Sequence, residues 1–409
     1  MKKILFLSYN YPNGEFGAST LCSTRIMKAL CQTGEYEVHC ISYESHGVPK
    51  YDIIDGVICH NVSLKPRRKT AYDKLRQILS LPLYPITHLY YDFKHFLACK
   101  KICKTERFDM VVSQYYPEQN LISAVLLKKY GYIDNLLVIF WDNLYGKLPR
   151  RFIPKWWAIR RQRYAENQIA KYVDTLISLY PIKAFHDKYG DVDNAEGKRF
   201  YLGIPSVVPP KPPINTPYYD FIKEDKINVI FSGSIIIKDY IKHIVQVFNS
   251  SCYAENINLI FFSVGMTAEE FEALKIDFKG EIIYNGYIPV EELCSMYTKA
   301  DILLSASGDS QSVRSKCFEY MTYGKPMVLV YGEDNDVNIQ TFSIYPNSVS
   351  IDARKSVVEN ASIINQYIEN NINRTVAFDV VEELFKKDSP KAYVELFTQR
   401  MSLKYKRDE

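Results

Sequence analysis

The sequence lacks long uninterrupted hydrophobic runs. Among its 409 residues, no stretch approaches the roughly 18 apolar residues that a membrane-spanning helix requires. The N-terminal segment MKKILFLSYNYP has only a short apolar core and is not followed by an A-x-A-like cleavage site. We therefore expect no signal peptide and no membrane-spanning segment, and we expect residues 3–8 to form a first strand.

Paired cysteine spacing and an excess of one charge are also missing. Cys99 and Cys103 lie four residues apart, but no second Cys/His pair with zinc-site spacing accompanies them among the nine cysteines. Reduced, partly buried thiols, a cytoplasmic location and no metal site are therefore expected. The net charge of +4 indicates no class of partner by itself.

Strand and helix patterns alternate in both halves of the chain. This alternation is typical of doubly wound parallel sheets, and 409 residues are too many for one core. Residues 203–219, GIPSVVPPKPPINTPYY, contain too many prolines for a helix or a central strand. The sequence therefore predicts an α/β protein with two Rossmann-like domains, residues 1–205 and 227–388, joined by a proline-rich linker at 206–226.

Polar residues follow two buried strand patterns of the first half. Tyr115 comes soon after DMVVS at 109–113, and Asp142 comes directly after LLVIFW at 136–141. The carboxyl ends of parallel strands line the ligand crevice, which makes both residues candidates for a site. A loop containing Gly14 and Gly17 leads into a helix expected at 19–33, but it matches G-x-G-x-x-G poorly. The loop could serve only to reverse the chain, and Asp142 could equally cap a helix.

Residues 301–330 read as strand, loop, helix, turn and strand. An apolar run at 302–304 is followed by a small, polar loop, and a helical pattern starts at Ser315. Gly324 and Pro326 predict the end of this helix, because glycine tolerates the left-handed conformation and proline cannot continue the turn. Such a unit directs the N–H groups of the helix N-terminus, around Val313 to Lys316, towards an anion.

Two segments interleave basic and aromatic residues. Residues 65–107 and 150–163 combine lysines and arginines with tyrosines and with Trp156 and Trp157. This composition suits an anionic membrane surface, although two solvated helices with aromatic anchors in the core are about as plausible. Nucleic-acid binding is not indicated, since no matching motif accompanies the charge.

The segment EYMTYGKPMV, starting at Glu319, resembles the signature E-[AY]-[ML]-A-x-G-x-P-V-V of family-4 glycosyltransferases with the GT-B fold. Gln311 stands eight residues earlier, where the family has a second Glu. Residues 233–235, Gly-Ser-Ile, stand where the family shows G-R-L, with Lys238 near the place of a family lysine. The turn at 285–289 and the following Glu-Glu-Leu resemble the family's G-x-[VI]-x-x-x-[ED]-L.

The resemblance implies a GT-B glycosyltransferase with parallel sheets facing an interdomain cleft. It implies a nucleotide-sugar donor held by the second domain, an acceptor held by the first, retention at the anomeric carbon, and no cofactor or obligatory metal. It also implies a C-terminal helix, residues 389–409, that crosses back to the first domain. The acceptor would be a glycan or a lipid-linked glycan at the cytoplasmic face of a membrane.

The resemblance assigns site residues in three groups. The donor-side residues are Gly17, Gly233, Ser234, Lys238, Tyr287, Ile288, Gln311, Ser312, Val313, Arg314, Ser315, Lys316 and Glu319. The acceptor-side residues are Gly14, Ala18, Tyr115 and Asp142, and the catalytic candidates are Asp142, Gln311 and Lys238.

Two other functions remain open at this point. A nucleotide-sugar epimerase of the same fold would need carboxylates and histidine around the sugar, and the loop at 305–316 offers only Asp309. A non-catalytic nucleotide-sugar-binding subunit is favoured by Gln311 and Ser234, which replace charged residues of the family. Binding and turnover assays would separate the three functions.

Overall fold

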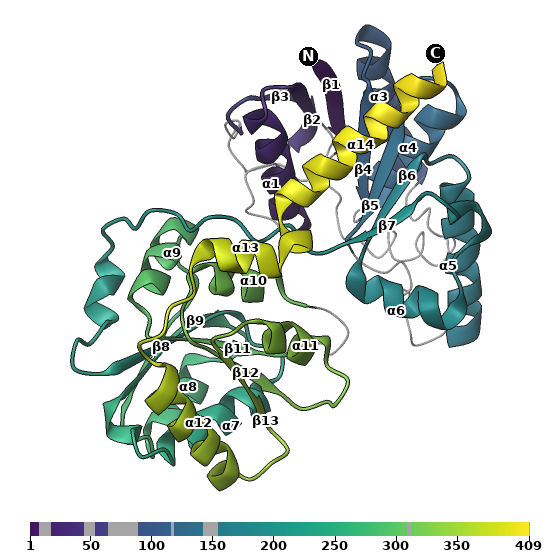
Figure 1. Ribbon diagram of the computed structural model, residues 1–409. Coiled ribbons are helices and arrows are strands. Elements are labelled where there is room, and N and C mark those ends of the chain that lie inside the picture. Colours follow the sequence, from purple (N-terminus) through teal and green to yellow (C-terminus); the bar gives the residue numbers. More distant parts are fainter. Residues whose placement is uncertain are drawn as a thin grey trace. The chain divides into compact units, whose positions relative to one another are not determined.

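The computed structural model describes residues 1–7, 18–44, 54–63, 89–115, 118–141, 154–308 and 313–408. The chain forms two compact units (Figure 1). Unit 1 comprises Met1–Pro205 and Lys387–Glu409, and unit 2 comprises Ser206–Lys386. The segment expected as a linker, 206–226, is grouped with unit 2.

Unit 1 is built on a seven-stranded sheet in which all neighbouring strands are parallel. The strand order is β3-β2-β1-β4-β5-β6-β7. The central strands are apolar on both faces because helices cover both sides of such a sheet. The strands are β1 (Lys2–Leu7), β2 (Tyr36–Glu44), β3 (Val57–Ser63), β4 (Met110–Tyr115), β5 (Leu136–Phe140), β6 (Thr175–Leu179) and β7 (Arg199–Leu202).

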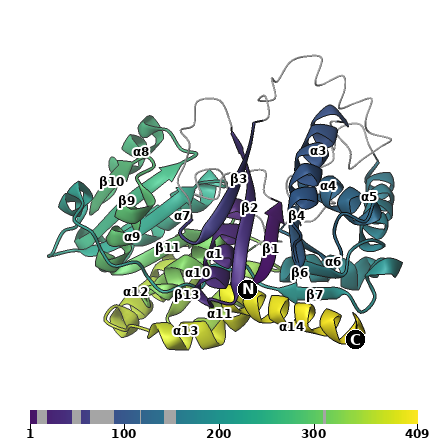
Figure 2. The same cartoon turned by 90° about the horizontal axis from the view of Figure 1, so that it is seen from above.

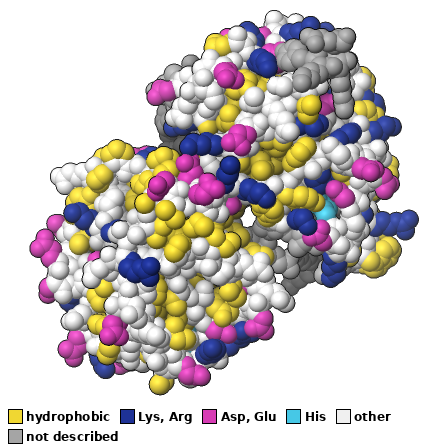
Figure 3. Space-filling model, viewed as in Figure 1, with side chains coloured by type: hydrophobic (Ala, Val, Ile, Leu, Met, Phe, Trp, Pro, Cys, Tyr) yellow, Lys and Arg dark blue, Asp and Glu magenta, His cyan; other side chains and the backbone are white. Residues whose placement is uncertain are grey.

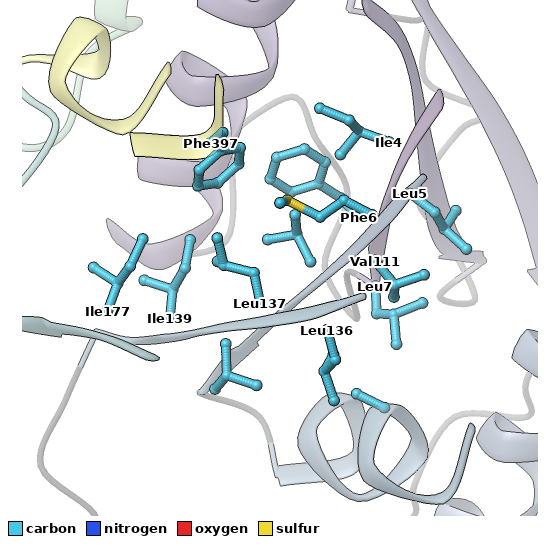
Figure 4. Close-up of a cluster of buried hydrophobic side chains, with 14 of the residues drawn as sticks. Ile4, Leu5, Phe6, Leu7, Val111, Leu136, Leu137, Ile139, Ile177 and Phe397 are labelled. Atoms are coloured by element: carbon cyan, nitrogen blue, oxygen red, sulfur yellow. The ribbon is translucent and has the colours of Figure 1, made fainter. Parts of the chain in front are cut away.

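The last helix of the chain belongs to unit 1. The helix α14 packs against α1, beside which it runs in Figure 1 and Figure 2. Phe397 of α14 faces Phe6 of β1, with 6.3 Å between ring centroids (Figure 4). Tyr393 is fully buried and donates to the Gly203 carbonyl at 2.7 Å. The helices of unit 1 are α1 (Ala18–Gln32), α3 (Leu89–Thr105), α4 (Glu118–Lys129), α5 (Lys155–Ala170), α6 (Tyr180–Tyr189) and α14 (Pro390–Asp408).

Unit 2 is built on a six-stranded parallel sheet with the order β10-β9-β8-β11-β12-β13. Its strands are β8 (Ile227–Ser234), β9 (Ile257–Val264), β10 (Glu281–Asn285), β11 (Ile302–Ala306), β12 (Met327–Tyr331) and β13 (Ser348–Asp352). Its helices are α7 (Lys238–Asn249), α8 (Ala268–Lys275), α9 (Val290–Lys299), α10 (Ser315–Thr322), α11 (Val337–Ile344), α12 (Val357–Asn371) and α13 (Phe378–Leu384).

The proline-rich segment at the start of unit 2 lies along α9. The backbone N–H of Ile214 donates to Ser295 Oγ at 2.9 Å, and Thr216 Oγ1 donates to Glu292 Oε2 at 2.6 Å. A short 3-10 helix, η4 (Pro217–Phe221), follows. These contacts fix the segment to unit 2. In the chain, the strands of one sheet precede the segment and those of a separate sheet follow it.

The two parallel sheets confirm the predicted α/β fold with two Rossmann-like units. All nine cysteines are free thiols, as expected. Of the helices that the structure describes, none combines the length and the apolar character needed to cross a bilayer. Figure 3 shows basic and acidic side chains interspersed over the face drawn, in keeping with the small net charge.

Candidate functional site

The carboxyl edge of the unit 2 sheet contains the point at which the strand order reverses. β8 is the first strand of this sheet in the chain, and its neighbours are β9 on one side and β11 on the other. The segments that follow β8 and β11 therefore leave the sheet in opposite directions, and open α/β sheets bind ligands at such a point. The predicted donor residues of unit 2 follow β8, β10 and β11.

The helix after β11 begins at the residue that the sequence predicts. α10 begins at Ser315, and Arg314 is its N-cap in an extended conformation. No side chain of the described residues caps this N-terminus. Its first N–H groups, around Val313 to Lys316, are therefore available to an anion.

Gly324 fixes the end of α10. Its φ of +69° lies in the left-handed region, and a Cβ here would lie 2.2 Å from the Val376 carbonyl oxygen. Val376 N–H donates to the Gly324 carbonyl at 2.9 Å. The glycine that the sequence analysis identified is therefore required both for the turn and for a close backbone approach.

Glu319 lies on the second turn of α10 and is mostly buried, with a 13% exposed side chain. Lys316 Nζ lies 3.2 Å from Glu319 Oε2 and 5.5 Å from the centroid of the Tyr297 ring. Cys294 of α9 donates weakly to Glu319 Oε1, with 3.9 Å between Sγ and oxygen. The carboxylate is thus held from two sides, by α10 and by α9.

Three buried hydroxyl groups lie beneath this pair of helices. Tyr320 Oη accepts from the Ser232 N–H at 2.8 Å and also contacts Ser232 Oγ at 2.8 Å. Tyr297 Oη contacts the same Ser232 hydroxyl. Burial raises the pKa of both tyrosines above the usual range, so both stay neutral and can hydrogen-bond. The cluster ties α9 and α10 to β8.

The end of β8 contacts the segments that follow β10 and β11. Gly233 has a φ of +114°, where glycine is favoured, and Ser234 Oγ lies 3.0 Å from Tyr287 Oη. Arg314 Nη1 donates to the Ser234 carbonyl at 3.1 Å. Tyr287 is 65% exposed, whereas Ile288 is buried. Ser234, which makes two of these contacts, is the last residue of β8.

Lys238, the first residue of α7, is engaged with a carboxylate. Its Nζ lies 2.7 and 2.8 Å from the two Glu270 oxygens. Glu270 also closes a capping box with Thr267 at the start of α8. The hydrogen bond from Lys238 lowers the pKa of Glu270, which stays ionised at neutral pH.

Two groups of the predicted unit 2 residues are in contact. Gly233, Ser234, Tyr287 and Arg314 form one connected group, and Lys316 and Glu319 form another on the same helix start. Sequence reasoning missed Cys294 and Tyr297 of α9. Their only sequence signal is their position on the helix that follows the predicted Asn285–Pro289 turn.

Several predicted residues remain untested by the geometry. Gly14, Gly17, Asp142, Gln311 and Ser312 lie outside the described residues. Ala18 is the first residue of α1. Tyr115 ends β4 and is buried against Phe140, with 6.1 Å between ring centroids, so its side chain is part of the core of unit 1.

Comparison with known protein families finds a match within unit 2. Residues 220–374 match the family described as Glycosyl transferases group 1. This range contains Ser234, Tyr287, Arg314 and Glu319. A comparison with curated protein sequences finds none that matches.

Solved structures resemble the whole chain. Sucrose-phosphate synthase from Thermosynechococcus elongatus has a TM-score of 0.66 at 12% identity, covering 98% of this chain and 100% of that chain. Anabaena Alr3699/HepE in complex with UDP-glucose has a TM-score of 0.60 at 12% identity, covering 98% and 100%. WaaG, a glycosyltransferase involved in lipopolysaccharide biosynthesis, has a TM-score of 0.55 at 14% identity, covering 96% and 99%. At these identities the likeness shows the fold. The chain therefore has the GT-B fold, and residues 220–374 match the glycosyl transferases group 1 family.

Proposed function

We propose that this protein is a metal-independent, retaining glycosyltransferase of family 4 that transfers a sugar from a nucleotide sugar to a glycan or lipid-linked acceptor. The observation that carries the proposal is the position of α10. In a region that matches glycosyltransferases of group 1, its uncapped N-terminus and Glu319 lie at the switch point of the sheet. A helix start suits a phosphate, and a carboxylate accepts hydrogen bonds from sugar hydroxyls.

The donor would lie along α10 with its diphosphate at the helix start. At about 1.5 Å rise per residue, Glu319 stands roughly 6 Å along the helix from Ser315, which suits a ribose beside the phosphates. Glu319 would then accept hydrogen bonds from both ribose hydroxyls. The backbone of the Tyr287–Ile288 turn would contact the base. Anabaena Alr3699/HepE binds UDP-glucose, so UDP sugars are the first donors to test.

Chemistry in this proposal depends on stabilising the departing diphosphate. N–H groups and side-chain cations around the helix start are already in place when negative charge develops on the leaving group. Gln311 would contact the transferred sugar, and Asp142 would lie near its anomeric carbon from the acceptor side. A same-face displacement then retains the configuration without a covalent intermediate.

The acceptor would bind unit 1, and unit 1 would also contact an anionic membrane surface at the cytoplasmic face. Exposed aromatic residues support this proposal: Phe93 on α3 is 58% exposed, and Trp156 on α5 is 66% exposed. Arg160 and Arg161 follow Trp156 on α5. The variant Trp156→Ala/Arg160→Glu/Arg161→Glu should lose flotation with vesicles that contain anionic lipid, since each basic residue near such a surface contributes about 1 kcal/mol. Equal flotation of variant and parent would refute membrane contact through α5.

The proposed function is tested by screening UDP, GDP and ADP sugars for thermal stabilisation and then for turnover. A bound donor raises the melting temperature because it binds only the folded state. Release of the nucleoside diphosphate together with a glycosylated acceptor is the expected result. A donor that is only isomerised would indicate an epimerase, and binding without any turnover would indicate a non-catalytic subunit.

A further inference from the structure

Three cationic side chains follow β8 or β11, and their partners differ. Lys238 contacts both oxygens of Glu270, and Lys316 contacts Glu319. Each lysine charge is therefore already matched by a carboxylate. Arg314 has no carboxylate within ion-pair distance among the residues that the structure describes.

The guanidinium of Arg314 is held in place by the end of β8. Nη1 donates to the Ser234 carbonyl at 3.1 Å, whereas Nη2 is buried and has no hydrogen-bond partner among the described residues. A carbonyl carries no full charge, so within the described part of the chain the positive charge of the guanidinium is uncompensated. A buried N–H donor without a partner is unfavourable, so a group that accepts from it is strongly favoured at this place.

A glycine makes room for this arrangement. A Cβ at Gly308, after β11, would lie 2.1 Å from Arg314 Nη2 and 2.7 Å from Ile236 Cδ1. Any larger residue at 308 would therefore displace the guanidinium. The side chain is thus seated between the ends of β8 and β11, at the point where the strand order reverses.

We infer that Arg314 is the cation that neutralises the diphosphate bound at the start of α10, and that Lys238 and Lys316 are not. The inference rests on the proposed function for the nature of the ligand. A nucleoside diphosphate released by sugar transfer carries more negative charge than the bound donor. A planar guanidinium binds two phosphate oxygens at once, which suits it to hold this group. Arg314 is the N-cap of α10, so its charge adds to the helix N-terminus at the same place.

The experiment measures the affinity of the full chain for UDP, GDP and ADP, for the matching nucleosides and for inorganic pyrophosphate. Arg314→Met should lower the affinity for the nucleoside diphosphate that the parent binds best by about tenfold or more. The affinity for the matching nucleoside should stay within about twofold of the parent. The diphosphate affinity of Arg314→Lys should lie between those of the parent and Arg314→Met, because lysine keeps the charge but cannot bind two phosphate oxygens as the planar guanidinium does.

Matched variants distinguish the effect of the position of the guanidinium on diphosphate affinity from the effect of its charge. Gly308→Ala keeps every charge and displaces the guanidinium, so it should weaken the diphosphate in the same way. It also serves as the second variant if Arg314→Met fails to fold. Lys242→Met, which removes a charge from the exposed surface of α7, should change nothing.

The outcomes distinguish this inference from the proposed function. Diphosphate affinity within about twofold of the parent in Arg314→Met, with a larger loss in Lys238→Met, overturns the inference and leaves the proposed function standing. A parent that binds no nucleoside diphosphate contradicts the proposed function. In that case the pyrophosphate affinities still test the role of Arg314. Equal pyrophosphate affinities of the parent and Arg314→Met would overturn the inference that Arg314 binds the diphosphate.

Discussion

At the residue scale, the candidate site rests on buried polar side chains beneath it. Ser232, Tyr297 and Tyr320 form a buried hydroxyl cluster under α9 and α10. Removing the Tyr320 hydroxyl takes away the hydrogen bond of the buried Ser232 N–H, and a buried donor left without its bond costs more than the bond itself contributes. The cluster therefore links the stability of unit 2 to the position of Glu319.

Replacing Tyr320 with phenylalanine tests this link. Tyr320→Phe leaves the Ser232 N–H without a partner and should lower the free energy of unfolding by about 1–3 kcal/mol in a denaturant titration. Tyr130→Phe is the matched control, since the ring of Tyr130 is 58% exposed, and it should change little. Equal stabilities of the two variants would show that the cluster does not hold the helices.

At the element scale, the sequence predicts the buried strands and misses three of the four edge strands. The apolar runs of β4, β5, β8 and β11 are visible because these strands are covered on both faces. β3, β7 and β13 were not predicted, and all three lie at sheet edges. An edge strand such as VICHNVS at β3 carries polar residues, so it lacks the apolar run that marks a buried strand.

Some features of the candidate site could likewise be predicted from the sequence, and others could not. The Ser315 start, the Gly324 end and the clustering of Ser234, Tyr287 and Arg314 follow from motif and turn chemistry. The pairing of Lys238 with Glu270 could not be predicted, because the two residues are 32 positions apart and meet only when α7 and α8 are placed. Cys294 beside Glu319 depends in the same way on tertiary packing.

The end of α10 gives a prediction at this scale. Gly324→Ala should destabilise unit 2 more strongly than Gly34→Ala destabilises unit 1. Both glycines have a φ near +70°, but only the Cβ at 324 would meet another atom, the Val376 carbonyl oxygen. The left-handed conformation alone costs about 1–2 kcal/mol, and the clash adds to it. Denaturant unfolding of both variants measures the difference, and a smaller loss at 324 would contradict the close approach.

At the scale of the whole molecule, the chain leaves unit 1 after Pro205 and returns at Lys387. The two segments are joined inside unit 1. Gly203 N–H donates to the Lys387 carbonyl at 2.9 Å, and Ile204 N–H donates to Asp388 Oδ1 at 2.9 Å. Gly203 is required here, because a Cβ would lie 1.9 Å from the same Asp388 oxygen.

Asp388 makes this junction sensitive to pH. Burial raises its pKa to about 7, while the Ile204 N–H and nearby Lys387 oppose the shift. Burial raises the pKa of the neighbouring Tyr393, with smaller contributions from Cys22 and Asp388, so Tyr393 stays neutral. Because the folded state binds the Asp388 proton more tightly than the unfolded state, this contribution to stability is complete below about pH 4 and is lost as the pH rises to about 7.

Asp388→Asn should remove that pH dependence. The amide oxygen can still accept from Ile204 N–H, and it has no charge to bury. Relative to the parent, the variant should gain about 1–3 kcal/mol of unfolding free energy between pH 5 and pH 8. Chemical denaturation at both pH values measures this gain. A constant difference between variant and parent would show that Asp388 does not titrate in this range.

The most direct test of the account is the nucleotide affinity of Glu319→Ala. If Glu319 accepts hydrogen bonds from the ribose, each charge-assisted bond is worth about 1.5–3 kcal/mol, so affinity for the nucleoside diphosphate should fall at least about tenfold while thermal unfolding shows an intact fold. Gln311→Ala should instead reduce turnover more than nucleotide binding. A Glu319→Ala protein that is folded and binds the nucleotide within about twofold of the parent would contradict the placement of the donor at α10.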